Sequence, residues 1–147
     1  MTSSALPLNG RLIAIDWGER RIGVAVSDES QTVARPLATL TRRDGKRFPM
    51  QQLRAHLDEH RPVGVVVGLP LDARGHEGKA AKAARAAGTL VSAKSGLPVG
   101  YVDERMSTAR AHAIRHEMGG VAPRDRGLID QAAAAILLQQ FMDGRRR

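Results

Sequence analysis

The sequence predicts an α/β protein with a mixed five-stranded sheet and helices on both faces. Three strand-like segments follow one another closely at the start of the chain, and this spacing favours antiparallel hairpins. The later strand-like segments are separated by helical ones, which favours parallel pairing. With 147 residues, 42% of them hydrophobic, the chain is long enough to bury a substantial core.

The first three strands form the antiparallel half of the predicted sheet. Residues 12–16 are apolar up to Asp16, as expected of a central buried strand. A second strand is predicted over residues 21–28, after a short turn. The third, residues 32–40, alternates more weakly and contains Pro36, which favours an edge position because proline cannot donate to a neighbouring strand.

After the third strand, helices and strands alternate. Proline fits the first turn of a helix, where its missing N–H is not needed, and glycine commonly ends one. The first expected helix opens at Pro49 and has Met50, Leu53 and Leu57 on its apolar face, and a strand follows over 63–69. An alanine-rich helix over 78–94, with Gly96 as its C-cap, leads to a strand over 99–102. The last two expected elements are a helix from Ser107 or Thr108 to 119 and a final helix over 125–142.

The resulting order, β-β-β-α-β-α-β-α-α, matches the ribonuclease H-like architecture. No internal repeat or linker interrupts the sequence, so we expect a single ribonuclease H-like domain over residues 1–147. Residues 1–10 and 144–147 are expected to be loose termini.

Composition narrows the class of function. The chain carries no cysteine, no apolar run long enough to cross a membrane and no signal-peptide pattern, so we expect a cytoplasmic protein with no membrane partner. Its formal net charge is +8. Arginine-rich surfaces suit phosphate because the guanidinium donates two parallel hydrogen bonds, which favours a nucleic-acid partner. Arginine richness that reflects only genomic base composition is the alternative.

Acidic residues in three separate segments are the main functional signal. Asp16 and the pair Asp103-Glu104 each follow a predicted parallel strand, and functional groups of open α/β sheets gather at that edge. Asp130 lies on the apolar stripe of the last helix, about 20° from Leu137 on a helical wheel. A carboxylate on such a stripe is costly unless it is paired, hydrogen-bonded or bound to a metal.

These carboxylates predict a Mg²⁺ or Mn²⁺ site for phosphodiester hydrolysis, because hard oxygen ligands suit these ions. Asp16, Glu104 and Asp130 are the expected catalytic and metal-binding residues. Asp103 is a further candidate, although neighbouring residues of a strand point to opposite faces. Each acid also has an ordinary structural interpretation: Asp16 as a turn residue, Asp103 or Glu104 as a partner of Arg105 or of the next helix N-terminus, and Asp130 as a partner of Arg124 or Arg126.

Four other residues are candidates for contact with nucleic-acid phosphate. Gly18 follows Asp16 in a turn where the backbone can approach a phosphate closely. Lys79 and Lys82 belong to a basic stripe on the alanine-rich helix, for which a solvated face is the alternative. Arg105 can stabilise charge on a phosphate or neutralise Asp103.

His112 and His116 are four residues apart, a spacing that can bind zinc on a helix. Because no third ligand lies nearby in the sequence, we interpret both as solvent-facing histidines.

Four ordered blocks within residues 11–142 form a recognisable pattern. They read Ile15-Asp-Trp-Gly-Glu-Arg-Arg-Ile-Gly-Val-Ala-Val-Ser-Asp28, Val65-Val-Val-Gly-Leu-Pro70, Val102-Asp-Glu-Arg-Met-Ser-Thr108 and Ile129-Asp-Gln-Ala-Ala133. In this order they resemble the signature blocks of the YqgF (RuvX) family.

The resemblance implies a ribonuclease H-like, metal-dependent nuclease related to the RuvC resolvases, with its acidic positions at Asp16, Glu104 and Asp130. Its implied role is maturation of the 5′ end of pre-16S ribosomal RNA. Trp17 and Met106-Ser107 depart mildly from the family pattern, which usually has Tyr or Phe and Leu-Thr there.

We therefore expect a nuclease that acts on structured RNA during ribosome biogenesis, as a monomer or homodimer. One alternative is a Holliday junction resolvase, which needs two subunits because a four-way junction is two-fold symmetric. The other is a non-catalytic RNA-binding factor of ribosome assembly.

Overall fold

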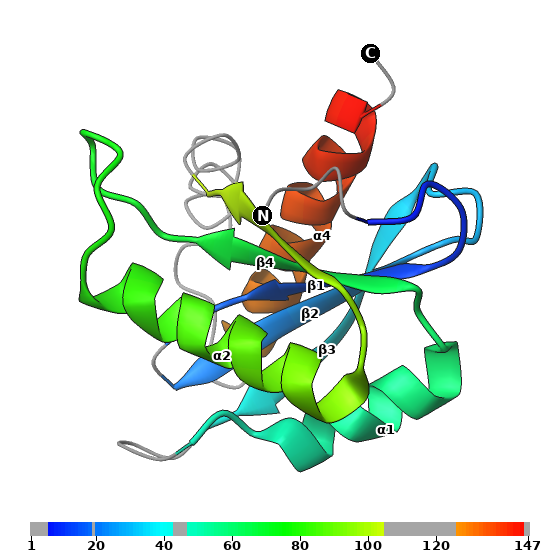
Figure 1. Ribbon diagram of the computed structural model, residues 1–147, viewed down its shortest axis with the longest axis horizontal. Coiled ribbons are helices and arrows are strands. Elements are labelled where there is room, and N and C mark those ends of the chain that lie inside the picture. The colour runs from blue at the N-terminus through cyan, green and yellow to red at the C-terminus, as the bar shows by residue number, and fades with distance from the viewer. Residues whose placement is uncertain (1–5, 19, 43–46, 105–125, 146–147) are drawn as a thin grey trace.

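The computed structural model describes residues 6–18, 20–42, 47–104 and 126–145, and its centre is one five-stranded sheet (Figure 1). The strand order is β3-β2-β1-β4-β5, with β1 antiparallel to β2, β2 antiparallel to β3, and β1, β4 and β5 parallel. This mixed sheet confirms the predicted fold class. Its strands are β1 (Leu12–Asp16), β2 (Arg21–Ser27), β3 (Ala34–Thr41), β4 (Gly64–Leu69) and β5 (Val99–Asp103).

Three described helices cover the two faces of the sheet. Figure 1 shows α1 (Met50–His60) and α2 (Lys79–Ser95) on one face and α4 (Arg126–Arg145) on the other. The alternation of side chains along each strand builds a separate core on each face. In β1, for example, Ile13 and Ile15 pack with α1 and α2, whereas Leu12 and Ala14 pack with α4.

The predicted helices agree with the structure where it describes them. Gly96 ends α2 in the left-handed conformation (φ +76°), as the sequence predicts. Pro49 precedes α1, whose Leu53 and Leu57 are buried. The helix predicted from Ser107 or Thr108 to 119 lies outside the described residues.

The turn between β2 and β3 corrects the predicted strand boundaries. Oδ1 of Asp28 accepts hydrogen bonds from the backbone N–H groups of Thr32 (2.7 Å) and Val33 (3.1 Å). These hydrogen bonds hold the pKa of Asp28 below its ordinary value of 3.8. Because the turn uses these amides, β2 ends at Ser27 and β3 begins only at Ala34. Pro36 lies on β3, which is an edge strand as expected.

Parts of both expected loose termini are packed. Leu6 is buried in the core beneath α4. Arg145, the last residue of α4, donates a hydrogen bond from a terminal guanidinium nitrogen to the carbonyl oxygen of Pro7 (2.8 Å). The two ends of the described chain therefore hold each other. In the described part of the chain, no helix has the length and apolar character needed to span a membrane.

Candidate active site

Asp16 lies at the carboxyl end of β1, between two glycines of the neighbouring strands. It pairs with Gly23 of β2, and the β1–β4 register, which matches Ile15 with Val67, brings it level with Gly68. Residues in register on neighbouring strands point to the same face of a sheet. A Cβ atom at Gly23 would meet Asp130 of α4, and one at Gly68 would meet Leu137 of α4. The side chain of Asp16 therefore belongs to the face that α4 covers.

Gly23 allows the start of α4 to lie directly against the sheet. A Cβ atom at this position would collide with the backbone carbonyl oxygen of Asp130 and lie 3.2 Å from its Cβ. No side chain other than hydrogen fits this space without moving the helix. The missing side chain of Gly23 thus brings Asp130 beside Asp16, although the two acids are far apart in the sequence.

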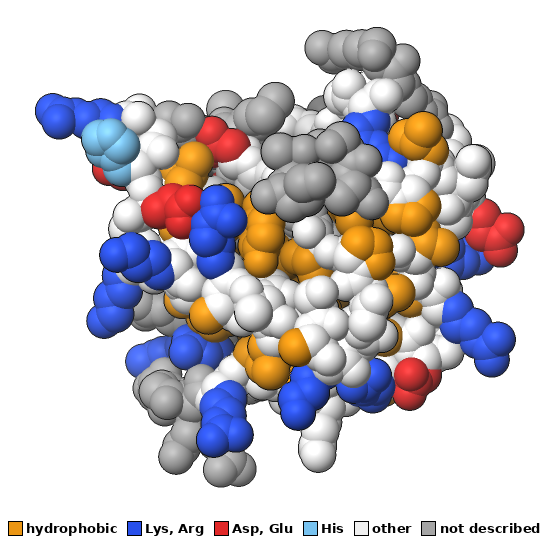
Figure 2. Space-filling model, in the orientation of Figure 1, with side chains coloured by type: hydrophobic (Ala, Val, Ile, Leu, Met, Phe, Trp, Pro, Cys, Tyr) orange, Lys and Arg blue, Asp and Glu red, His pale blue; other side chains and the backbone are white. Residues whose placement is uncertain are grey.

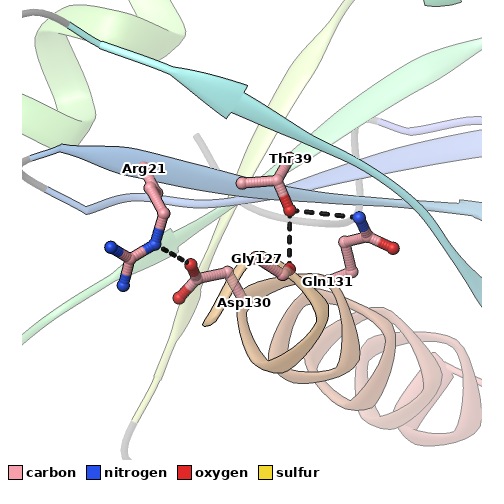
Figure 3. Close-up of polar contacts among 5 residues, drawn as sticks. All are labelled: Arg21, Thr39, Gly127, Asp130 and Gln131. Atoms are coloured by element: carbon pink, nitrogen blue, oxygen red, sulfur yellow. Dashed lines mark hydrogen bonds and ion pairs between the residues drawn. The ribbon is translucent and has the colours of Figure 1, made fainter. Parts of the chain in front are cut away.

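Three polar contacts hold this end of α4 in place (Figure 3). The hydroxyl of Thr39, the β3 partner of Gly23, donates a hydrogen bond to the carbonyl oxygen of Gly127 at 2.6 Å. The Gln131 amide donates to the same hydroxyl at 3.1 Å. Arg21, at the start of β2, donates from Nε to Oδ2 of Asp130 at 2.6 Å. The orientation of Asp130 is therefore set by residues of β2 and β3.

Glu104 follows β5 and reaches the same face. Its backbone N–H donates to the carbonyl oxygen of Leu69 at 3.1 Å, which continues the β4–β5 pairing. Its carboxyl group lies over Gly68, where a Cβ atom would be 2.7 Å from Oε1 of Glu104. Asp103 is one residue earlier, and Val102 before it packs in the core beneath α4. Strand alternation therefore assigns Asp103 to the opposite face, which favours Glu104 over Asp103 as a partner of Asp16.

The three predicted catalytic acids thus share one face and one end of the sheet. Within the described residues, no three carboxylates have oxygen atoms that all lie within 4.8 Å of one another, and Asp130 is engaged by Arg21. Asp16, Glu104 and Asp130 nevertheless offer three carboxylate groups, whose hard oxygen atoms are the ligands that Mg²⁺ and Mn²⁺ prefer. Gly68 leaves space for the Glu104 carboxylate beside Asp16. These residues fit a divalent cation of this class.

The predicted phosphate contacts differ in their surroundings. Gly18 is in a tight turn, where a Cβ atom would collide with the carbonyl oxygen of Arg21, so the turn itself requires glycine. Lys79 and Lys82 are exposed on α2, as a phosphate-binding surface or a solvated face would be. Arg105 lies outside the described residues.

Trp17 anchors the other face of the sheet next to Asp16. Its ring lies 6.4 Å from that of Phe48, and the Arg42 guanidinium lies over it at 4.7 Å. These three residues line a cavity of about 260 Å³ against α2. The stacking on Phe48 fixes Trp17, the residue that follows Asp16. The cation–π contact places the Arg42 guanidinium at the same end of the sheet.

Several residues of this site are not evident from the sequence alone. Gly23, Thr39 and Arg21 act through contacts with α4 that are about 90–110 positions away in the chain, such as Arg21–Asp130. The sequence signal that could have identified Gly23 is a glycine within an otherwise apolar strand, because such a glycine often marks the close approach of another backbone.

Two solved structures share this architecture. One is T. thermophilus RuvC in complex with a Holliday junction substrate (TM-score 0.53, 21% identity, 92% of this chain and 95% of that chain). The other is the Fowlpox virus resolvase in complex with Holliday junction DNA (TM-score 0.50, 10% identity, 93% and 99%). The fold and the acidic edge define the class: a ribonuclease H-like α/β protein.

Sequence comparison identifies the family. Residues 10–144 match the family model of RuvX, described as Holliday junction resolvase. Relatives named "Putative pre-16S rRNA nuclease" include those of Cutibacterium acnes, 43% identical over 92% of this chain and 84% of that protein, and of Anaeromyxobacter sp., 38% identical over 92% and 98%. The chain belongs to the RuvX family.

Proposed function

We propose that this chain is a metal-dependent nuclease that hydrolyses phosphodiester bonds of structured RNA, and that its substrate is the 5′ end of pre-16S ribosomal RNA. The observation that carries the proposal is the common face of Asp16, Glu104 and Asp130 at the carboxyl end of β1 and β5. The names of the relatives support the choice of RNA. The proposal includes a cytoplasmic location, which the absence of cysteine in the sequence supports.

In this proposal, Asp16, Glu104 and Asp130 hold Mg²⁺ or Mn²⁺. When bound, such ions activate water and neutralise charge on the scissile phosphate. Gly23 leaves room for Asp130 and Gly68 leaves room for Glu104, and Thr39 fixes the start of α4. The strands and the helix fix the backbone positions of the three acids, so metal binding requires movement of their side chains and of the Arg21 guanidinium that holds Asp130.

Basic residues around this edge bind the nucleic-acid backbone. Figure 2 shows Lys and Arg side chains gathered along the left and lower rim of the face that carries α2, and β4 points toward the left side in Figure 1. Lys79 and Lys82 of α2 contribute exposed cations, and the half-buried Arg42 contributes another cation above Trp17. Contacts of this kind bind phosphates without reading sequence, so affinity should fall steeply with salt.

A Holliday junction resolvase is the second candidate, favoured by the family description. A cleavage assay separates the two. Purified protein with Mg²⁺ or Mn²⁺ is given either a pre-16S 5′-leader RNA or a four-way DNA junction, beside Asp16→Asn. The control is Asp58→Asn, an exposed aspartate of α1 on the same face of the sheet as α2 and away from the three acids.

Cleavage of the RNA alone, lost in Asp16→Asn and retained in Asp58→Asn, supports the proposal. Selective cleavage of the junction assigns the chain to the resolvases instead. If Asp16→Asn folds and cleaves as well as the parent protein, the assignment of the site is wrong. Tight RNA binding without cleavage of either substrate favours the assembly-factor alternative.

A further inference from the structure

The last turns of α1 carry a group of potential metal ligands that the nuclease site does not use. His56, Glu59 and His60 each offer a ligand atom, and these atoms all lie within 4.8 Å of one another. Among the described His, Asp and Glu residues, no other set of three meets this criterion. The helix ends directly afterwards, at Arg61, which adopts the left-handed conformation.

The two histidines present buried ring nitrogens. The His60 side chain is 12% exposed, and its Nε2 lies 4.0 Å from Oε1 of Glu59, beyond hydrogen-bond distance. Nε2 of His60 and Nδ1 of His56 are both buried and have no hydrogen-bond partner among the described residues. A buried nitrogen without a hydrogen-bond partner destabilises the fold. A cation that accepts the lone pair of each ring would remove this destabilisation.

We propose that His56, Glu59 and His60 bind one Zn²⁺ ion. Histidines four residues apart lie on the same side of a helix, and the His-x-x-Glu-His spacing occurs on zinc-binding helices. At zinc–ligand distances of about 2.0–2.2 Å, tetrahedral ligand atoms lie about 3.4 Å apart. The present atoms, within 4.8 Å, need to approach by about 1.4 Å at most. Glu59, with a side chain 71% exposed, is free to rotate by this amount.

The ligand chemistry separates this site from the acidic one. Imidazole favours zinc, whereas the all-carboxylate set favours magnesium or manganese. The two sites also lie at opposite ends of the sheet, because α1 ends just before β4 begins and the acids lie where β1 and β5 finish. The proposed site is therefore separate from the acidic site, and its loss should leave the nuclease site intact.

The surroundings leave room for the fourth coordination position. Glu59 and His60 line an open cavity of about 650 Å³ together with Asn9, Glu29 and Ser30 from the segments that flank β1 and β2. Arg11 and Arg61 also line it, and the two glutamates offset their charge. Water can complete a three-ligand zinc site from this cavity.

The test is zinc titration calorimetry on the untagged full chain, with cobalt absorption as a second readout of histidine ligation. His56→Gln, Glu59→Gln and His60→Gln remove one ligand each. His76→Gln is a matched control because that side chain is 74% exposed and lies on the β4–α2 loop. His116→Gln is a second control, since His112 and His116 repeat the four-residue spacing outside the described residues.

The expected result is one equivalent of bound Zn²⁺, with affinity lowered about tenfold or more by His56→Gln and by His60→Gln, since even losses outside the ligand shell cost 10–100-fold. Both controls and Asp16→Asn should bind as the parent does. Zn²⁺ should also raise Tm in the parent but not in His60→Gln. Absence of zinc binding, or binding that is lost only in His116→Gln, overturns the proposal, whether or not the chain is a nuclease.

Discussion

Asp130 of α4 and Arg21 of β2 form an ion pair in which Nε of Arg21 lies 2.6 Å from Oδ2 of Asp130. The Asp130 side chain is 17% exposed and that of Arg21 is 39% exposed. The acid that lies on the apolar stripe of α4 is thus paired with a cation, as its placement requires. Among the described residues, the cation paired with Asp130 is a residue of the sheet and not Arg126, which is close in sequence, while Arg124 lies outside the described residues. A metal ion that uses Asp130 must share or displace this partner.

Arg21→Gln should tighten divalent-metal binding at the acidic site, because it removes a cation that competes for Asp130. The cost in stability should be small, about 0–1 kcal/mol, since the pair is partly exposed. Isothermal titration with Mn²⁺ compares the variant with the parent and with Arg54→Gln, a control on α1 that bonds only the carbonyl of Lys94 in the described structure. Weaker Mn²⁺ binding in Arg21→Gln would mean that Arg21 orients Asp130 for the metal rather than competing with it.

The ion pair between Glu77 and Arg85 should make stability depend on pH. Nε of Arg85 donates to both carboxylate oxygens of Glu77 (2.7 and 2.8 Å), and these hydrogen bonds lower the pKa of Glu77 from its ordinary value of 4.5. A lowered pKa stabilises the folded state above pH 4.5, and this contribution is lost as the pH falls through the lowered value.

The Tm difference between the parent and Glu77→Gln should therefore be present at pH 7 and smaller at pH 3, which lies below the ordinary pKa of 4.5. Thermal unfolding followed by circular dichroism at both pH values measures it, with Asp58→Asn as the control for a general effect of lost negative charge. A difference that is the same at pH 3 and pH 7 would show that the side chain of Glu77 acts through packing rather than charge.

The fold was predictable because its signals are local. The apolar run that ends at Asp16, the left-handed Gly96 and the edge proline Pro36 each depend on residues nearby in the chain. The edge of the sheet that carries the acids followed from the strand order alone.

What could not be predicted depends on register and on long-range packing. The two glycines that flank Asp16 are recognisable as neighbours only when the strand pairing is known, and the partner of Asp130 is 109 positions away in the chain. The grouping of His56, Glu59 and His60 around two buried ring nitrogens is likewise evident only in the folded chain.

Gly23→Ala should destabilise the protein by about 1–3 kcal/mol, because the added methyl group collides with the Asp130 backbone and forces α4 away from β2. Gly144→Ala is a matched control in which the expected change in the free energy of unfolding has the opposite sign. Gly144 is helical and has open space around its Cβ position, so alanine should stabilise the helix by about 0.5–1 kcal/mol or less at this terminal position. Urea unfolding measures both. Equal stability of Gly23→Ala and the parent would contradict the close packing at this position.

Glu104 and Asp103 are neighbours whose side chains belong to opposite faces of the sheet, so they offer a sharp test of the site. Glu104→Gln should lower the rate of RNA cleavage by about 10²-fold or more, as the loss of a group that stabilises charge at the reacting centre does. Asp103→Asn should lower it by less than about tenfold, because its place on the α2 side separates it from Asp16. Both substitutions keep the size of the side chain, so folding should be preserved in each.

Single-turnover cleavage with saturating Mn²⁺, alongside circular dichroism of each variant, gives the comparison between these neighbours. If Asp103→Asn is the more damaged of the two, the strand must end before Asp103 when substrate is bound, and the ligand next to Asp16 would be Asp103. If neither variant loses activity, the reacting centre lies away from β5, and Asp16 and Asp130 must act with acids outside the described residues.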